Sequence, residues 1–143
     1  TELLNDPDVE FIEVNNNGRL LLGFHPERGG FTATVGAQTI ALNHFFSVEG
    51  MPISMSNDGL TIIGEGERGG WIYSRHQQKT WYLNELLTDE LWGDDVRIAR
   101  LLWMSPDGQN LVAQFSSEHG SRDNLIAIRI PDLLQRVEQM EHK

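Results

Sequence analysis

The stretch ISMSNDGLTIIG, from Ile53 to Gly64, has the pattern of a β-hairpin. Its first part alternates apolar and polar residues, its Asp-Gly pair suits a tight turn, and its second part is mostly apolar. The same pattern occurs twice more in the chain, as IEVNNNGRLLLG (12–23) and as LWMSPDGQNLVA (102–113). Three related hairpins in one chain indicate a structural repeat.

The first two copies match well beyond the hairpin. They continue with ERGGF (27–31) and ERGGW (67–71), and each then runs through a short strand pattern into a further extended piece, TIALN (39–43) or TWYLN (80–84). The third copy departs after its hairpin and keeps one strand pattern near 125–130. Repeats of about 40 residues with four short strands are typical of β-propeller blades.

We therefore predict an all-β fold of about three four-stranded antiparallel propeller-type blades, forming a partial or split propeller. The blade-like repeats are expected within one domain, at about 9–50, 51–96 and 97–131. After Pro131, the segment DLLQRVEQMEHK (132–143) places apolar residues at helical spacing, and Asp132 suits an N-cap. This segment predicts a short C-terminal helix, which either packs on the sheet or serves as a linker or docking helix toward another domain.

Three blades do not close a ring, because propellers typically have about four to eight. An open end also leaves an unpaired strand edge, which favours aggregation. The opening ELLND (2–6) resembles ELLTD (85–89), which follows the fourth strand pattern of the second copy. We therefore expect that the chain begins at the tail of a preceding blade, and that it is a fragment or is completed by another chain or a second copy.

The composition argues against several classes of partner and excludes the sites that need cysteine. The chain has 143 residues, a formal net charge of −10 and no cysteine. Nucleic acid and anionic lipid are unfavourable partners for such an acidic protein, because proteins bind phosphates with Lys and Arg. No apolar run approaches the roughly 18 residues of a spanning helix, so we expect no membrane span. The lack of cysteine excludes disulfides, thiolate metal sites and a cysteine nucleophile.

Motifs for catalysis or metal binding are absent from the sequence. The five histidines lack HExxH or HxH spacing, and the Asp-rich pieces lack the calcium-loop pattern. No GxSxG, Walker or dinucleotide fingerprint occurs either. We therefore predict no catalytic residue, no metal site and no cofactor.

The repeated ERGG motif admits two interpretations. In the first, which we favour, each motif is a hairpin loop in which paired glycines supply positive φ while the charged side chains stay solvated. In the second, Glu27, Arg28, Glu67 and Arg68 form two equivalent binding sites. The arginines would then offer forked donors to carboxylates of a ligand.

Aromatic residues are the other candidates for an interaction. Trp92 lies in the acidic loop 88–97, where we expect it to be exposed, and an exposed Trp is typical of an interface anchor. Most strand aromatics are expected in the core, with Trp71 and Tyr73 on one face of their strand. Trp103 stands directly before the third turn.

The repeat resembles those of bacterial extracellular HAF-type proteins and, more distantly, those of TolB- and YVTN-like β-propellers. The resemblance is carried by ISMSNDGLTIIG (53–64), GWIYS (70–74) and YLNELL (82–87), by the matching parts of the first copy, and by LLWMSPDGQNLVA (101–113) in the third. It covers most of the chain and implies a β-propeller-like binding or scaffold module. Such modules are often exported, which implies an extracellular or periplasmic location. The resemblance implies no catalytic residue.

Three functions are compatible with these observations. The first is a non-catalytic β-propeller segment that acts as a protein-interaction or scaffold module and completes a larger propeller with another chain or a second copy. The second is a glycan- or small-ligand-binding sensor module that uses aromatic residues and the ERGG loops. The third is part of a propeller enzyme whose catalytic residues lie outside this chain.

Overall fold

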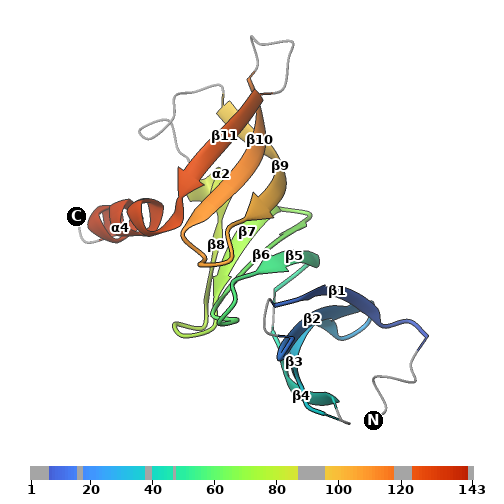
Figure 1. Ribbon diagram of the computed structural model, residues 1–143. Coiled ribbons are helices and arrows are strands. Elements are labelled where there is room, and N and C mark those ends of the chain that lie inside the picture. Colours follow the sequence, from blue (N-terminus) through green and yellow to red (C-terminus); the bar gives the residue numbers. More distant parts are fainter. Residues whose placement is uncertain are drawn as a thin grey trace.

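The computed structural model describes residues 7–15, 18–37, 40–46, 48–86, 96–117 and 124–141. In this part of the chain, three antiparallel sheets stand in a row, coloured from blue to cyan, from green to yellow and from gold to red in Figure 1. Within each sheet, strands that follow one another in the sequence are neighbours in space. The prediction of an all-β fold built from repeated antiparallel sheets is confirmed, and the described sheets do not close into a ring.

The first sheet consists of β1 (Glu10–Val14), β2 (Leu20–His25), β3 (Gly29–Val35) and β4 (Ile40–Phe45). The second consists of β5 (Met51–Met55), β6 (Thr61–Gly66), β7 (Gly69–Ser74) and β8 (Lys79–Tyr82), and the short helix α2 (Leu83–Leu86) follows it. The third consists of β9 (Val96–Met104), β10 (Asn110–Ser117) and β11 (Asn124–Arg129), and the helix α4 (Ile130–Glu141) follows it.

The third sheet has three strands among the described residues, so the prediction of four strands in every repeat is wrong here. After β11 the chain enters α4 at Ile130 instead of forming another strand. The physical reason is local: Pro131 has no N–H to donate to a strand ladder, and the apolar residues beyond it have helical spacing. Because α4 begins before position 132, Asp132 lies in its first turn and not at the N-cap.

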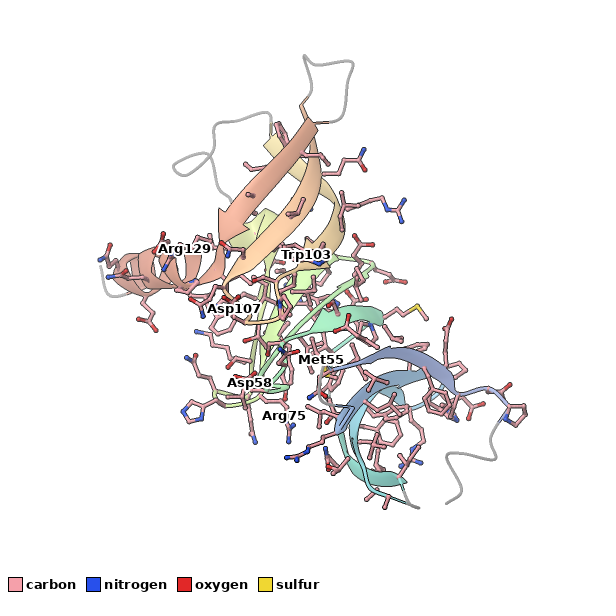
Figure 2. All side chains as sticks on the ribbon, viewed as in Figure 1. Met55, Asp58, Arg75, Trp103, Asp107 and Arg129 are labelled. Carbon is pink, nitrogen blue, oxygen red and sulfur yellow. The ribbon has the colours of Figure 1, made fainter. Side chains whose placement is uncertain are left out.

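The three Gly-centred turns share one construction. A glycine with positive φ stands in each of them, namely Gly18 (68°), Gly59 (72°) and Gly108 (72°). In the second turn Ser56 Oγ donates to Asp58, and in the third Ser105 Oγ donates to Asp107, both at 2.5 Å. The bond from Ser105 is the main cause of the lowered pKa of Asp107. Figure 2 labels both aspartates, whereas Asn17 of the first turn lies outside the described residues.

The first strand of every sheet carries a β-bulge at the same place, shortly before the turn. The extra residue in the pairing with the next strand is Ile12 in β1, Ile53 in β5 and Leu102 in β9. A bulge changes which side chains face each side of a sheet, so a shared bulge keeps the faces in register from one repeat to the next. The three sheets can therefore be compared residue by residue.

Two apolar clusters hold the sheets together face to face. In β7, Trp71 belongs to the cluster shared with Leu22 of the first sheet, whereas Ile72 belongs to the cluster shared with Leu111 of the third sheet. Successive side chains of a strand point to opposite faces, so these two clusters bury the second sheet on both sides. Leu133 of α4 joins the cluster between the second and third sheets, so the helix packs on the sheets.

Two glutamates also accept hydrogen bonds across the junctions between sheets. The carboxylate of Glu13 in β1 accepts from Ser54 Oγ at 2.8 Å and from the N–H of Met55 at 3.3 Å. The carboxylate of Glu65 in β6 accepts from the N–H of Leu101 at 2.5 Å. The sequence interpretation did not single these residues out, although an acidic residue within or just after an apolar strand is a usable signal of such a role.

Candidate functional site

The two ERGG motifs form the turns that the favoured interpretation predicts. Glu27 and Arg28 lie in the turn between β2 and β3, and Glu67 and Arg68 lie in the turn between β6 and β7. All four residues are exposed. The structure therefore places them at equivalent positions of two neighbouring sheets, in the turn that follows the second strand of each sheet.

The two glycines of each motif have different roles, and the expectation that both supply positive φ is wrong for the second one. Gly29 has a φ of 95° and Gly69 a φ of 90°, a region that glycine adopts without strain. A Cβ on Gly30 would lie 2.4 Å from the ring of Phe46 in the connection to the second sheet. A Cβ on Gly70 would likewise lie 2.8 Å from Leu101 of the third sheet, so the second glycine permits close approach of the next sheet.

Both arginines lie over an aromatic ring of the fourth strand. The Cζ atom of Arg28 is 4.0 Å from the ring centre of Phe45, and that of Arg68 is 3.7 Å from the ring centre of Tyr82. Arg68 Nε also donates to Glu85 of α2 at 3.2 Å, and its Nη2 contacts the same carboxylate oxygen. The hydrogen bond to Glu85 is the main cause of the raised pKa of Arg68. Each arginine thus holds its turn against the outer strand.

Side chains outside the motif hold the backbone of both turns. In the first turn, Nδ1 of His25 accepts from the N–H groups of Glu27 and Arg28 at 3.1 and 3.2 Å. In the second turn, the carboxylate of Glu49 accepts from the same two positions of the motif, at 2.9 and 3.2 Å. Glu49 follows β4 and precedes β5, so it ties the connection between two sheets to the second ERGG turn.

The described aromatic residues follow the expectation that most strand aromatics lie in the core. Trp92 lies outside the described residues, and its role as an interface anchor stays a prediction. Trp71 and Tyr73 are buried on one face of β7, as expected. Trp103 of β9, labelled in Figure 2, is exposed and is an exception to that expectation. Its face of the third sheet has no described sheet against it, and this is why Trp103 is exposed.

Within the described ranges, no three His, Asp or Glu side chains gather in a way that would hold a metal ion. No helix in the same part of the chain has the length and apolar character required to cross a membrane. At the two ERGG turns, charged and aromatic side chains contact one another within the chain.

Comparisons with known proteins found no matching family model, no matching curated protein and no matching solved structure. The resemblance to extracellular repeats and to TolB- or YVTN-like β-propellers therefore stays a prediction that depends on the motifs themselves.

Proposed function

We propose that this chain is a non-catalytic β-propeller segment that serves as a protein-interaction or scaffold module. One observation carries the proposal: the face at each end of the row of three equivalent sheets exposes large apolar side chains, and no described sheet covers it. The large apolar side chains exposed on these two faces are Phe11, Val14 and Leu42 on the first sheet, and Trp103 and Leu125 on the third. Exposed apolar surface of this kind is typical of contacts between proteins.

The structure also favours this function over that of a sensor module. A sensor for glycans or small ligands would use the ERGG loops, but Arg28 and Arg68 are engaged by Phe45, Tyr82 and Glu85 of the same chain. A binding site for a small ligand is usually a concave pocket with a few convergent polar groups. The face around Trp103 is instead one side of a β-sheet, which suits the broad surface of another protein.

A photo-crosslinking experiment tests this function. A photoreactive amino acid replaces Val112, which lies beside Trp103 on the end face of the third sheet, in cells that produce the protein. Leu60 is the control position, because it is exposed in the turn between β5 and β6 and lies on neither end face. We expect a discrete protein adduct from position 112 and none from position 60. Absence of an adduct at position 112, or equal adducts at both positions, contradicts the proposed function.

A further inference from the structure

The two junctions inside the chain follow one rule. The face of the earlier sheet that contains Leu22 or Ile63 packs on the face of the later sheet that contains Met55 or Met104. Leu22 and Ile63 occupy the same repeat position, and the two methionines occupy another. All four side chains are buried, so each junction joins one kind of face to the opposite kind.

The third sheet presents to solvent the face that corresponds to the Leu22 and Ile63 faces of the first two sheets. Its residues Trp103 and Val112 pair across β9 and β10, as Ser54 and Ile63 pair across β5 and β6. Ser54 has 7% of its surface exposed at the junction, whereas Trp103 has 50% exposed. Ala127 is also exposed here, although Ile72 at the same position of the second sheet is fully buried. In the described part of the chain, no sheet therefore covers this face, whereas the next sheet covers it in the other two.

The first sheet presents to solvent the face that corresponds to the Met55 and Met104 faces of the other two sheets. Val14 occupies the position of Met55 and Met104, which are 2% exposed at the internal junctions, yet Val14 is 50% exposed. Phe11 is 49% exposed, whereas Leu101 at the same position of the third sheet is 3% exposed. Side chains of the first sheet itself already cover the centre of this face, so its uncovered apolar surface lies on β1.

We propose that a second copy of this chain covers both ends, and that two chains associate head to tail into a closed ring of sheets. The inference rests on the proposed function, because it names the partner of the same end faces. The exposed face of the third sheet and the exposed face of the first sheet are the two kinds of face that pack on each other at both internal junctions. Two copies can therefore cover each other's exposed faces without a third component. Two chains of three sheets give a ring of six, within the range of about four to eight blades in propellers.

The internal junctions also predict which residues meet. At the first junction, the Glu13 side chain reaches the backbone N–H of Met55 at 3.3 Å. Trp103 is the repeat equivalent of Glu13, and Val14 is the repeat equivalent of Met55. Trp103 of one chain is therefore placed beside Val14 of the partner subunit, where both side chains become buried.

Cysteine cross-linking tests this pairing, since the natural chain contains no cysteine that would react in the background. One preparation carries Val14→Cys, the other carries Trp103→Cys, and the two are mixed and oxidised. We expect a disulfide-linked dimer that contains one chain of each kind, at several times the yield of either preparation alone. Dimers that join Trp103→Cys to itself, or the absence of any linked product, overturn the head-to-tail ring.

The mass in solution provides a second test that does not depend on cysteine. The natural chain is expected at twice the 16.2 kDa of one copy, and Val14→Asp or Trp103→Asp is expected to shift it to a single copy. Leu60→Asp, an equally drastic change away from both faces, is expected to keep the dimer. Circular dichroism checks that all three variants are folded. A dimer that survives both end-face changes overturns the inference.

The two proposals fail in different ways. A folded monomer that still gives a photo-adduct with another polypeptide from position 112 overturns the second copy as partner and leaves the proposed function intact. A folded monomer that gives no adduct from position 112 overturns both.

Discussion

A small residue opposite a large one recurs across the second and third strands of every sheet. The pairs are Gly23 with Phe31, Gly64 with Trp71, and Ala113 with Ile126. A Cβ on Gly23 would lie 2.4 Å from Cζ of Phe31, so the ring lies over the glycine of the neighbouring strand. Where the large residue is isoleucine instead of an aromatic, alanine takes the place of glycine. The side chain on one strand thus limits the size of the residue on the next.

This coupling predicts the effect of substituting Gly23. We expect Gly23→Ala to lower the free energy of unfolding by about 2 kcal/mol, because the added methyl group overlaps the Phe31 ring. In a chain that already carries Phe31→Ile, which imitates the third sheet, the same change is expected to cost much less. Urea denaturation of the four chains in this double-mutant cycle measures the coupling.

Ala113→Gly is the matched control for that cycle. It makes the reverse change at the equivalent position of the third sheet and is expected to cost about 1–2 kcal/mol, from backbone entropy and from the loss of a buried methyl group. An equal cost of Gly23→Ala in both backgrounds would show that the ring is not the reason for glycine at this position.

At the level of elements, α4 takes the place in the chain that β4 and β8 hold in the first two repeats. Its residues Ile130 and Leu133 are buried in the cluster between the second and third sheets. The helix therefore contributes side chains to this core, whereas a fourth strand would lie at the edge of the third sheet. A helix of this length gains most of its stability from such packing and little from intrinsic propensity.

The packing of α4 predicts a large difference between two alanine substitutions in the helix. Leu133→Ala is expected to lower the free energy of unfolding by about 2–4 kcal/mol, because it removes a buried side chain from the core. Gln135→Ala, on the exposed part of the same helix, is expected to change it by less than about 0.5 kcal/mol. Chemical denaturation gives both values, and similar small effects at the two positions would mean that α4 does not pack on the sheets.

At the level of the whole molecule, the row of sheets gives the middle sheet a special place. Among the described residues, the second sheet packs on another sheet through both of its faces, whereas the first and third sheets each pack on another sheet through one face. In such a row every unit contacts only its neighbours, so a local change acts mainly on the adjacent junction.

Hydrogen exchange is expected to follow this arrangement. In a chain that carries Trp103→Asp to prevent association, the amides of β6 and β7 should exchange more slowly than those of the first and third sheets. Adding Leu22→Ala, which weakens the junction between the first and second sheets, should speed exchange in the first sheet far more than in the third. Uniform acceleration throughout the chain would instead indicate a single cooperative unit.

The amino-acid sequence alone determined the repeat, the three Gly-centred turns, the ERGG turns and the approximate place of the C-terminal helix. These features depend on interactions within a few residues: alternation of side chains along a strand, the tolerance of glycine for positive φ, and helical spacing after a proline. The equivalent settings of Asp58 and Asp107 illustrate this, because each carboxylate is held by a serine only two residues away.

Only the tertiary structure decided which sheet faces are covered. The second glycine of each ERGG motif, the glutamates at the junctions and the exposure of Trp103 all depend on residues far along the chain. Trp103 is a large aromatic residue of a type that is often buried, but no described sheet packs against its face. Local patterns show that a side chain is suited to burial, but burial itself requires a neighbour, and the number of sheets in the row determines whether that neighbour exists.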